Sequence, residues 1–288
     1  MKISIIIIGY NTLNTLKLLL QSINDLNYND SCEVIYVDDG STDGSYSCFE
    51  DFNLKYNKKG FSFQKNSGRV FARQKAIELS CGDWLFFTQS NVILDPFILS
   101  KYQKGLVVPG VVAVGGGVFY QSEDEAFIKY LNHKTRGVHK YGSCSKMHYK
   151  HLLFLNCIIK KSVFDKVNFN PVFNSYGGKE LDFAFRLNGV FPNAIIACRD
   201  ALITRINYPD YLTHCLRFYE YGSKNFTLLN VELKKNVVHY PFLLHGGIVL
   251  SFLVNVFYYL SSITYKINSR IIRLGLLCSL LRGYYKTK

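Results

Sequence analysis

Two adjacent carboxylates, Asp38 and Asp39, follow a short apolar run and precede a glycine, Gly40. A carboxylate at the end of a buried parallel strand can accept hydrogen bonds from a base imino group and from ribose hydroxyls. That chemistry recognises a nucleoside without a metal ion. Gly40 would let the backbone turn tightly beside the two acids. Asp-Gly-Ser alone is also an ordinary turn signal, so the assignment depends on the elements around it.

A second candidate for anion chemistry is a pair of arginines, Arg69 and Arg73, four residues apart on one face of a predicted helix. A guanidinium in this position can hold a diphosphate through charge-assisted hydrogen bonds. Arg69 is equally well explained as a solvated helix residue, and we assign Arg73 to the diphosphate.

The elements that must position these residues show two alternating periodicities over the first 105 residues. A continuous β-branched run predicts a strand buried on both faces at residues 3–8, and further strands are predicted at residues 34–37, 61–64 and 84–87. Helical spacing predicts a helix over 13–23, capped by Asn11 or Thr12, and another over 69–79, closed by Gly82. This alternation is typical of βαβ units and a mostly parallel sheet, in which ligands bind beyond the carboxyl ends of the strands. Three polar clusters fall there: Gly9-Tyr10-Asn11, Asp38-Asp39 and Gln89-Ser90-Asn91.

Beyond residue 105 the pattern predicts strands over 106–114 and 152–159, with a break at the three glycines 115–117. Residues 129–151 hold four of the seven histidines and have no clear period, so we interpret them as a long loop. Long loops of this kind are commonly functional. A solvated basic loop explains these histidines better than a metal cluster, because no helical ligand spacing accompanies them.

Composition excludes a disordered chain, because 48% of the 288 residues are hydrophobic and only 19% are charged. The net charge of +13 predicts a surface that attracts phosphorylated small molecules, acidic lipid headgroups or nucleic acid. Eight cysteines show no CxxC spacing, and the N-terminal residues show no secretory signal pattern. We therefore expect reduced thiols in a cytoplasmic protein, with Cys32 and Cys157 in the core.

The C-terminal segment differs from the rest of the chain. From Arg205 onward, eleven Lys and Arg accompany three acidic residues, and residues 242–264 carry no formal charge unless His245 is protonated. That stretch is long enough to cross a bilayer, although its polar and glycine residues make it an imperfect span. An interfacial helix or a re-entrant hairpin fits about as well, and a buried helix of a soluble protein is the remaining explanation. We predict a membrane-associated segment over 230–288, after a catalytic domain over 1–229.

Several motifs in order resemble the family 2 glycosyltransferases with the GT-A fold, enzymes that pass a sugar from a nucleotide diphosphate donor to an acceptor. The resemblance rests on residues 4–11, 37–45, 66–68, 72–73, 82–84, 156, 164 and 176–187. It covers roughly residues 3–220, and the combination is far more specific than any single piece. It implies a Rossmann-like α/β GT-A fold with a mostly parallel sheet. Together, the resemblance and the chemistry of the residues predict a donor site that comprises Gly9, Tyr10, Asp38, Asp39, Asn66, Gly68, Arg73, Gln89, Asn91 and Arg205.

The sequence departs from the family at its metal site. The family's Asp-x-Asp motif corresponds to Gln89-Ser90-Asn91, so that both carboxylates are amides, and Arg205 stands where the family often has a histidine ligand. Amides are weak ligands for Mg²⁺ or Mn²⁺. We assign no metal ligand and expect no cofactor, although binding of either ion stays open. Either Arg205 neutralises the leaving diphosphate in place of a metal, or catalysis has been lost.

The family's catalytic Glu-Asp pair corresponds to Lys179-Glu180, so the resemblance implies that Glu180 is the base, with Asp182 as the alternative. A base must take the proton from the acceptor hydroxyl as that oxygen attacks the anomeric carbon. Both acids could instead only complement the dipole at the start of a helix.

We therefore predict an inverting glycosyltransferase of cell-envelope polysaccharide biosynthesis, at the cytoplasmic side of the membrane. Its partners would be a nucleotide-sugar donor, a glycan or lipid-linked glycan acceptor and an anionic membrane surface. The alternative is a catalytically inactive protein that binds sugar nucleotide or glycan. Nucleic acid is not an expected partner, because the basic residues concentrate beside the apolar segment.

Overall fold

The computed structural model describes all residues, 1–288, and divides them into two compact units. Unit 1 comprises residues 1–121, 134–169 and 183–207, and unit 2 comprises residues 122–133, 170–182 and 208–288. Neither set of boundaries falls at residue 230, and the predicted division there stays a prediction.

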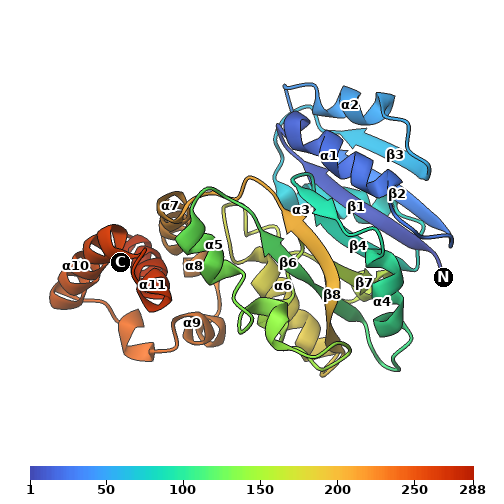
Figure 1. The fold of residues 1–288 in the computed structure, drawn as a ribbon. Coiled ribbons are helices and arrows are strands. Elements are labelled where there is room, and N and C mark those ends of the chain that lie inside the picture. Colours follow the sequence, from blue (N-terminus) through green and yellow to red (C-terminus); the bar gives the residue numbers. More distant parts are fainter. The chain divides into compact units, whose positions relative to one another are not determined.

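Unit 1 is built on an eight-stranded sheet with the order β3-β2-β1-β4-β7-β6-β8-β5 (Figure 1). The strands are β1 (Ile3–Gly9), β2 (Cys32–Asp38), β3 (Asn57–Ser62), β4 (Trp84–Gln89), β5 (Val92–Leu94), β6 (Ala113–Tyr120), β7 (Cys157–Lys160) and β8 (Ile195–Arg205). The pairs β1–β2, β1–β4, β2–β3 and β6–β8 are parallel, and the other three pairs are antiparallel. The prediction of a mostly parallel sheet therefore holds for the half that contains β1.

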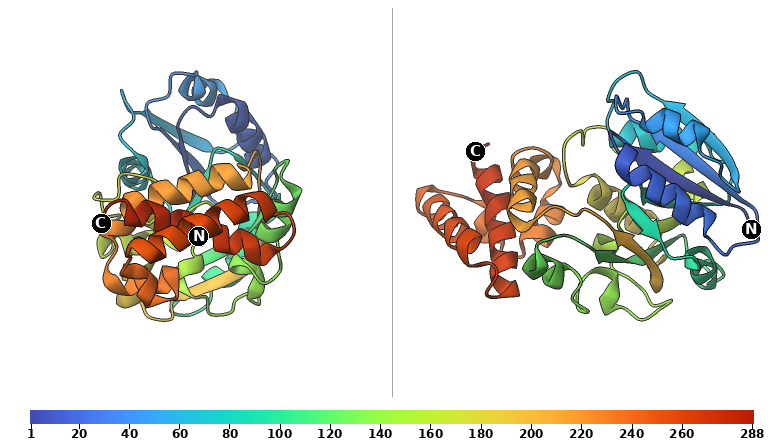
Figure 2. Two further views of the ribbon diagram at one scale, coloured as in Figure 1. Left: turned by 90° about the vertical axis from the view of Figure 1, so that its left-hand side faces the viewer. Right: turned by 45° about the horizontal axis from the view of Figure 1, so that its top comes forward.

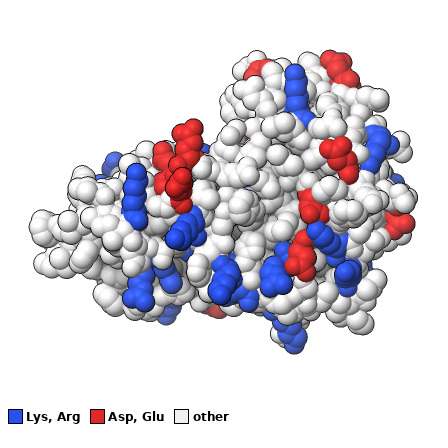
Figure 3. Space-filling model, in the orientation of Figure 1, with Lys and Arg blue, Asp and Glu red and all other residues white.

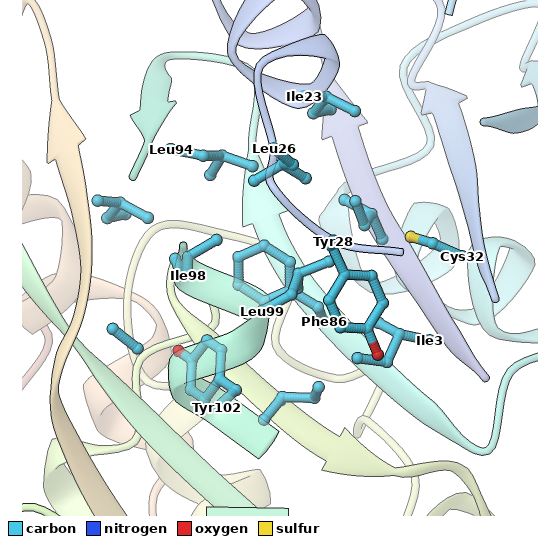
Figure 4. Close-up of a cluster of buried hydrophobic side chains, with 14 of the residues drawn as sticks. Ile3, Ile23, Leu26, Tyr28, Cys32, Phe86, Leu94, Ile98, Leu99 and Tyr102 are labelled. Atoms are coloured by element: carbon cyan, nitrogen blue, oxygen red, sulfur yellow. The ribbon is translucent and has the colours of Figure 1, made fainter. Parts of the chain in front are cut away.

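Alternate residues of β1 point to two different cores of unit 1. Ile3, Ile5 and Ile7 pack with side chains from α1 (Leu13–Asn24), α2 (Ser45–Asp51) and α4 (Ile98–Leu106). Figure 4 shows how Ile3, Ile23, Phe86 and Leu99 meet in this cluster. On the other side of β4, Phe87 contacts a group of aromatic rings that also includes Phe154, Phe164, Phe169 and Phe183. Cys32 and Cys157 are buried as predicted, and all eight cysteines are free thiols.

Several boundaries differ from the sequence-based predictions. The helix α3 (Arg69–Leu79) matches its predicted range, whereas β3 begins four residues earlier than predicted. The predicted strand over 106–114 is wrong, because α4 ends at Leu106 and β6 begins only at Ala113. The three glycines at 115–117 do not break the chain either. They lie within β6, where both β7 and β8 pair with it and the register to β8 shifts between Gly116 and Gly117.

Between β6 and β7 the chain forms α5 (Glu125–Leu131), which belongs to unit 2, and the short 3-10 helices η1 (Gly137–Lys140) and η2 (Tyr149–His151). After β7 follow η3 (Lys161–Asp165) and α6 (Lys179–Val190). The remaining elements, all in unit 2, are α7 (Tyr211–Ser223), α8 (Asn225–Leu228), α9 (Val231–Val238), η4 (Pro241–Leu244), α10 (Ile248–Thr264) and α11 (Ser269–Tyr285).

Within unit 2, α11 packs against both α7 and α10, and Figure 2 shows α10 and α11 side by side in both views. The contact with α7 is close because Gly283 has no side chain: a Cβ there would lie 2.0 Å from the backbone oxygen of Tyr219. The segment 242–264 is not one continuous helix, since η4 and α10 are separated at Gly246 and Gly247. None of the helices combines the length and the apolar character that crossing a bilayer requires.

Asn156 holds the register shift between β6 and β8 in place. Its side chain is fully buried, accepts a hydrogen bond from Tyr102 Oη at 2.7 Å and donates to the backbone oxygens of Gly117 at 2.6 Å and Ala201 at 2.8 Å. Each of these groups would otherwise be buried without a partner, which is costly.

We predict that Asn156→Ala lowers the free energy of unfolding by about 3 kcal/mol or more, because two backbone oxygens and one hydroxyl lose their partner. Tyr102→Phe removes only one of these hydrogen bonds and should cost about 1 kcal/mol. Denaturant unfolding can be followed by the fluorescence of Trp84, the single tryptophan, which lies in β4 of the same sheet. Equal losses in the two variants would contradict this role.

Candidate active site

The carboxyl ends of β1, β2 and β4 meet at one edge of the sheet in unit 1, as expected. Gly9 pairs with Asp38 and Ile8 pairs with Gln89, so the loops that follow these strands begin at the same level. This brings Gly9, Tyr10, Asp38, Asp39, Gln89 and Asn91 to one edge, which we call the donor edge. Tyr10 is half exposed there, whereas the two aspartates are buried.

Asp38 organises the loop that follows β2. Its carboxylate is fully buried and accepts hydrogen bonds from Tyr36 Oη at 3.2 Å, Ser62 Oγ at 3.0 Å, and both the backbone nitrogen and Oγ of Ser41 at 2.8 and 2.5 Å. Burial, and then the charge of Asp38, raise the pKa of Tyr36, which keeps that phenol a donor. Both oxygens of Asp38 therefore have donors within the protein, and its contact with a nucleoside stays a prediction.

Asp39 joins the same loop to the segment before α3. One of its oxygens accepts from the backbone nitrogens of Ser67 at 2.7 Å and Gly68 at 3.0 Å, and the other also accepts from Gly68 at 3.0 Å. Burial raises the pKa of Asp39, and the nearby charge of Asp38 raises it further, against the opposing effect of the two amides. These bonds bring Asn66 and Gly68, two predicted donor-site residues, to the donor edge. Asn66 is exposed.

A third aspartate, Asp43, provides the cap that we predicted for Asn11 or Thr12. Its carboxylate accepts from the backbone nitrogen of Leu13, the first residue of α1, at 2.9 Å, and from Ser45. Burial alone would raise the pKa of Asp43, but these hydrogen bonds lower it. Asn11 instead accepts from the backbone nitrogen of Thr42 at 2.9 Å. Thr12 does stand at the N-cap position, as predicted, but its side chain makes no capping hydrogen bond, because the acceptor for Leu13 lies thirty residues away in the sequence.

The two predicted arginines of α3 differ in their surroundings. The Arg73 side chain is buried, with its guanidinium 5.0 Å from the ring centre of Phe154 and 5.1 Å from that of Phe169. Its assignment to the diphosphate stays a prediction, and this packing offers a structural explanation for the residue. Arg69 is exposed at the start of α3, and its charge lowers the pKa of Asp39. Of the two arginines, Arg69 is therefore the one with an exposed guanidinium beside the donor edge. Helical spacing alone does not reveal which of the two is exposed.

Arg205 and Gln89 meet at the donor edge, as the last residues of β8 and β4. Arg205 Nη1 donates to Gln89 Oε1 at 2.5 Å, and Arg205 pairs in the sheet with Val92, close to Asn91. The amide oxygen that would have to coordinate a divalent cation is thus bound to a guanidinium. The chain also has no group of three or more His, Cys, Asp or Glu side chains that could hold a metal ion. A neutral amide beside a fixed positive charge does not fit Mg²⁺ or Mn²⁺.

The second part of the predicted site, Glu180 and Asp182, lies in the first turn of α6 and belongs to unit 2. Both side chains are partly exposed. Burial, and then the charge of Glu180, raise the pKa of Tyr221, a residue of α7. The position at the start of α6 agrees equally with catalysis and with the dipole explanation.

The loop that leads into α6 is held by α7 and α8. Asn225 is fully buried and donates to the backbone oxygens of Ser175 and Gly177, both at 2.7 Å. Gly177 has a φ of +77°, and a Cβ there would lie 2.7 Å from the ring of Tyr221. Both observations require glycine at this position. Sequence reasoning included neither Tyr221 nor Asn225 in the site, because they lie more than forty residues after the loop.

Residues 4–167 match the sequence profile of glycosyl transferase family 2, which is more than half of the chain. The chain belongs to this family. Membership confirms the predicted resemblance, which rested on motifs inside and beyond the matched residues.

Individual relatives agree with this family. The chain is 32% identical over 104 residues to the uncharacterized glycosyltransferase YfnE of Bacillus subtilis, covering 36% of this chain and 26% of the relative. It is 30% identical over 94 residues to the B. subtilis putative glycosyltransferase EpsH, covering 33% of this chain and 27% of the relative. The match to each relative thus spans only about a quarter of the relative's length.

Solved structures confirm the α/β fold of the GT-A type. S. aureus TarS 1-349 in complex with UDP is similar over the whole chain and 90% of its own length, with a TM-score of 0.62. The mannosyltransferase PcManGT from Pyrobaculum calidifontis, in complex with GDP-Man and Mn²⁺, gives a TM-score of 0.66 over the whole chain and 88% of its own length. Both are 15% identical to the chain, so the likeness concerns the fold.

We predict that Gly177→Ala destabilises the loop before α6 by about 1–3 kcal/mol, because the left-handed backbone and the Tyr221 ring both oppose a Cβ. Hydrogen exchange of residues 174–182 should become faster. Gly189→Ala, in the same helix α6, is the matched control: a Cβ there would contact nothing within 4 Å. It should leave exchange unchanged or slower, since alanine favours a helix over glycine. Faster exchange in both variants would show that the loop geometry is not the cause.

Proposed function

We propose that this protein transfers a sugar from a nucleoside diphosphate donor to a glycan acceptor, with inversion at the anomeric carbon and without a divalent metal ion. The hydrogen bond between Arg205 and Gln89 carries the metal-independent part of this proposal. Family membership and the donor edge support the transfer itself. The ligands named in the TarS and PcManGT structures, the nucleoside diphosphate UDP and the sugar donor GDP-Man, support a nucleoside diphosphate as the leaving group.

In the proposed reaction the acceptor oxygen attacks the anomeric carbon on the face opposite the diphosphate. The new carbon–oxygen bond forms as the bond between this carbon and the diphosphate oxygen breaks, which inverts the configuration. Glu180 takes the proton of the acceptor hydroxyl. The electron pair of the broken bond leaves with the diphosphate, and the fixed positive charge of Arg205 stabilises that developing charge.

The acceptor and the location are also part of the proposal. A lipid-linked or surface glycan of the cell envelope, reached from the cytoplasmic side of a membrane, is consistent with the free cysteines. It is also consistent with the basic and apolar C-terminal segment.

A second candidate function follows from the same pair of amides. If the loss of the carboxylates at positions 89 and 91 has abolished turnover, the protein would bind a sugar nucleotide or glycan without transferring it. The two functions differ in one measurement, because both retain donor binding and only the first hydrolyses or transfers the donor.

We predict that transfer is unchanged by EDTA and falls by about a hundredfold or more in Arg205→Ala, the typical effect of removing one group that stabilises transition-state charge. Arg199→Ala is the matched control, because Arg199 lies in the same strand but is exposed and pairs with Asp200. The assay measures transfer and donor hydrolysis over a panel of sugar nucleotides. Strict dependence on Mn²⁺ would overturn the metal-independent mechanism. Donor binding without turnover under any condition would favour the inactive binding protein.

We predict further that Glu180→Gln lowers transfer by about a hundredfold or more, since the amide keeps the shape but cannot accept the proton. Donor affinity by calorimetry should remain unchanged. Asp182→Asn, two residues along the same helical turn, serves as the comparison. If Asp182→Asn causes the loss and Glu180→Gln does not, the base is Asp182, and if neither does, the acids serve only the helix.

A further inference from the structure

The helix α10 has an unusual distribution of side chains: every exposed residue in it is apolar. Ile248 is 91% exposed and Ile263 is 80% exposed, at opposite ends of the helix. We call the whole set the apolar face of α10: Ile248, Val249, Phe252, Leu253, Phe257, Tyr259, Leu260 and Ile263. A helix on the surface of a soluble protein normally shows the reverse pattern, with its polar residues toward water. Contiguous exposed apolar surface of this kind marks an interaction site.

Two polar residues of α10, Asn255 and Ser261, have partners in α11 and α7, whereas Ser262 and Thr264 bond to backbone oxygens of α10 itself. Asn255 Oδ1 accepts from Arg282 Nε of α11 at 2.8 Å, and Asn255 Nδ2 donates to the backbone oxygen of Ser251 at 2.8 Å. The guanidinium of Arg282 lies 3.9 Å from the ring centre of Tyr258. Ser261 is buried and accepts from Tyr211 Oη at 3.3 Å. Rotating α10 to bury its apolar face would break these contacts, so the helix is fixed with that face outward.

The charges around α10 indicate what covers this face. Residues 233–288 contain eight Lys and Arg and no Asp or Glu, although Asp124 accepts a hydrogen bond from Tyr265 Oη, directly after α10, at 3.1 Å. Lys266 follows the C-terminal end of α10, and Arg270 and Arg273 are exposed at the start of α11. At the other end, Lys288 Nζ donates to the backbone oxygens of Leu244 and His245. In Figure 3 the surface where α10 lies, at the far left, is white, without charged side chains. Cationic groups thus lie at both ends of an uncharged apolar face.

We propose that the apolar face of α10 docks in the headgroup region of an anionic lipid bilayer, with the helix parallel to the membrane plane. Apolar and aromatic side chains would enter the boundary of the acyl chains, and the lysines and arginines at both ends would contact lipid phosphates. A second copy of the chain fits less well, because it would bring an equally cationic segment against this one without acidic partners. Only the biological purpose, access to a lipid-linked acceptor, rests on the proposed function.

The test is co-sedimentation of the full-length protein with phosphatidylcholine vesicles that contain phosphatidylglycerol, compared with phosphatidylcholine vesicles alone. The wild type should bind the anionic vesicles and bind the neutral ones more weakly. The variant Ile248→Ser/Phe252→Ser/Ile263→Ser should bind both at least about tenfold more weakly, because it loses apolar area. Lys266→Gln/Arg270→Gln/Arg273→Gln should lose on the order of a hundredfold toward anionic vesicles only.

The control replaces three exposed apolar residues outside the face, Phe97→Ser/Val107→Ser/Val172→Ser, and should bind like the wild type. Circular dichroism melting should be unchanged in the apolar-face variant, since its three residues are exposed. Equal binding of wild type and apolar-face variant, or no binding of the wild type to either vesicle, would overturn the proposal. The proposal would also be overturned if the wild type bound no vesicles but formed a dimer in sedimentation analysis, and the apolar-face variant did not form that dimer.

The outcomes also separate this proposal from the proposed function. Vesicle binding requires no donor and no turnover, so it can succeed when transfer fails. Conversely, transfer to an acceptor in free solution should persist in the apolar-face variant, because none of its three residues belongs to the donor edge or to the start of α6.

Discussion

The register of β1 with β2 and β4 is the constraint on which the donor edge depends. Because Gly9 pairs with Asp38 and Ile8 with Gln89, the three loops leave the sheet at one level. A shift of one residue would turn every side chain of a strand to the opposite face. Ser4, the one polar side chain of β1, opposes such a shift, because its buried Oγ donates to Glu33 Oε1 of β2 at 2.6 Å and accepts from the backbone nitrogen of Gly82, just before β4, at 2.9 Å. A buried hydrogen bond at one end of β1 thus helps to determine where the polar chemistry lies at the other.

At the donor edge, the carboxylates of two aspartates hold the loops of the protein itself in place through hydrogen bonds. Asp38 and Asp39 together accept seven hydrogen bonds from Tyr36, Ser41, Ser62, Ser67 and Gly68. Where the resembled family carries two further acids, this chain has amides and a guanidinium. The change removes two anionic ligands and adds a guanidinium, which disfavours a metal ion at these positions and favours an anion. This difference is the physical basis for the proposed reaction without metal.

The sequence was sufficient to predict those strands and helices that depend on a local pattern of residues. β1, β2 and β4 follow from continuous apolar runs, and α3 follows from helical spacing. It failed where distant residues decide, as at Asp43, which caps α1, and at the glycines of β6, which remain in the sheet because two neighbouring strands pair with them. It could not distinguish Arg69 from Arg73, since spacing does not reveal that aromatic rings enclose only the second. The orientation of α10 was equally hidden, because it depends on Arg282 reaching Asn255.

The distribution of charge along the chain bears on both the proposed donor site and the proposed membrane contact. Residues 233–288, about a fifth of the chain, supply eight of its thirteen net positive charges and contain none of its 21 acidic residues. A nucleotide-binding edge needs only a few fixed cations, and Arg205 is the one that we propose for this role, with Arg69 exposed beside the donor edge. The remaining excess lies in the segment that contains α10, a long helix whose exposed side chains are all apolar. If the cations served only solubility, the exposed apolar face would be unexplained. If the apolar face bound another protein, the eight cations in a segment without acidic residues would be unexplained. An anionic lipid surface accounts for both features at once.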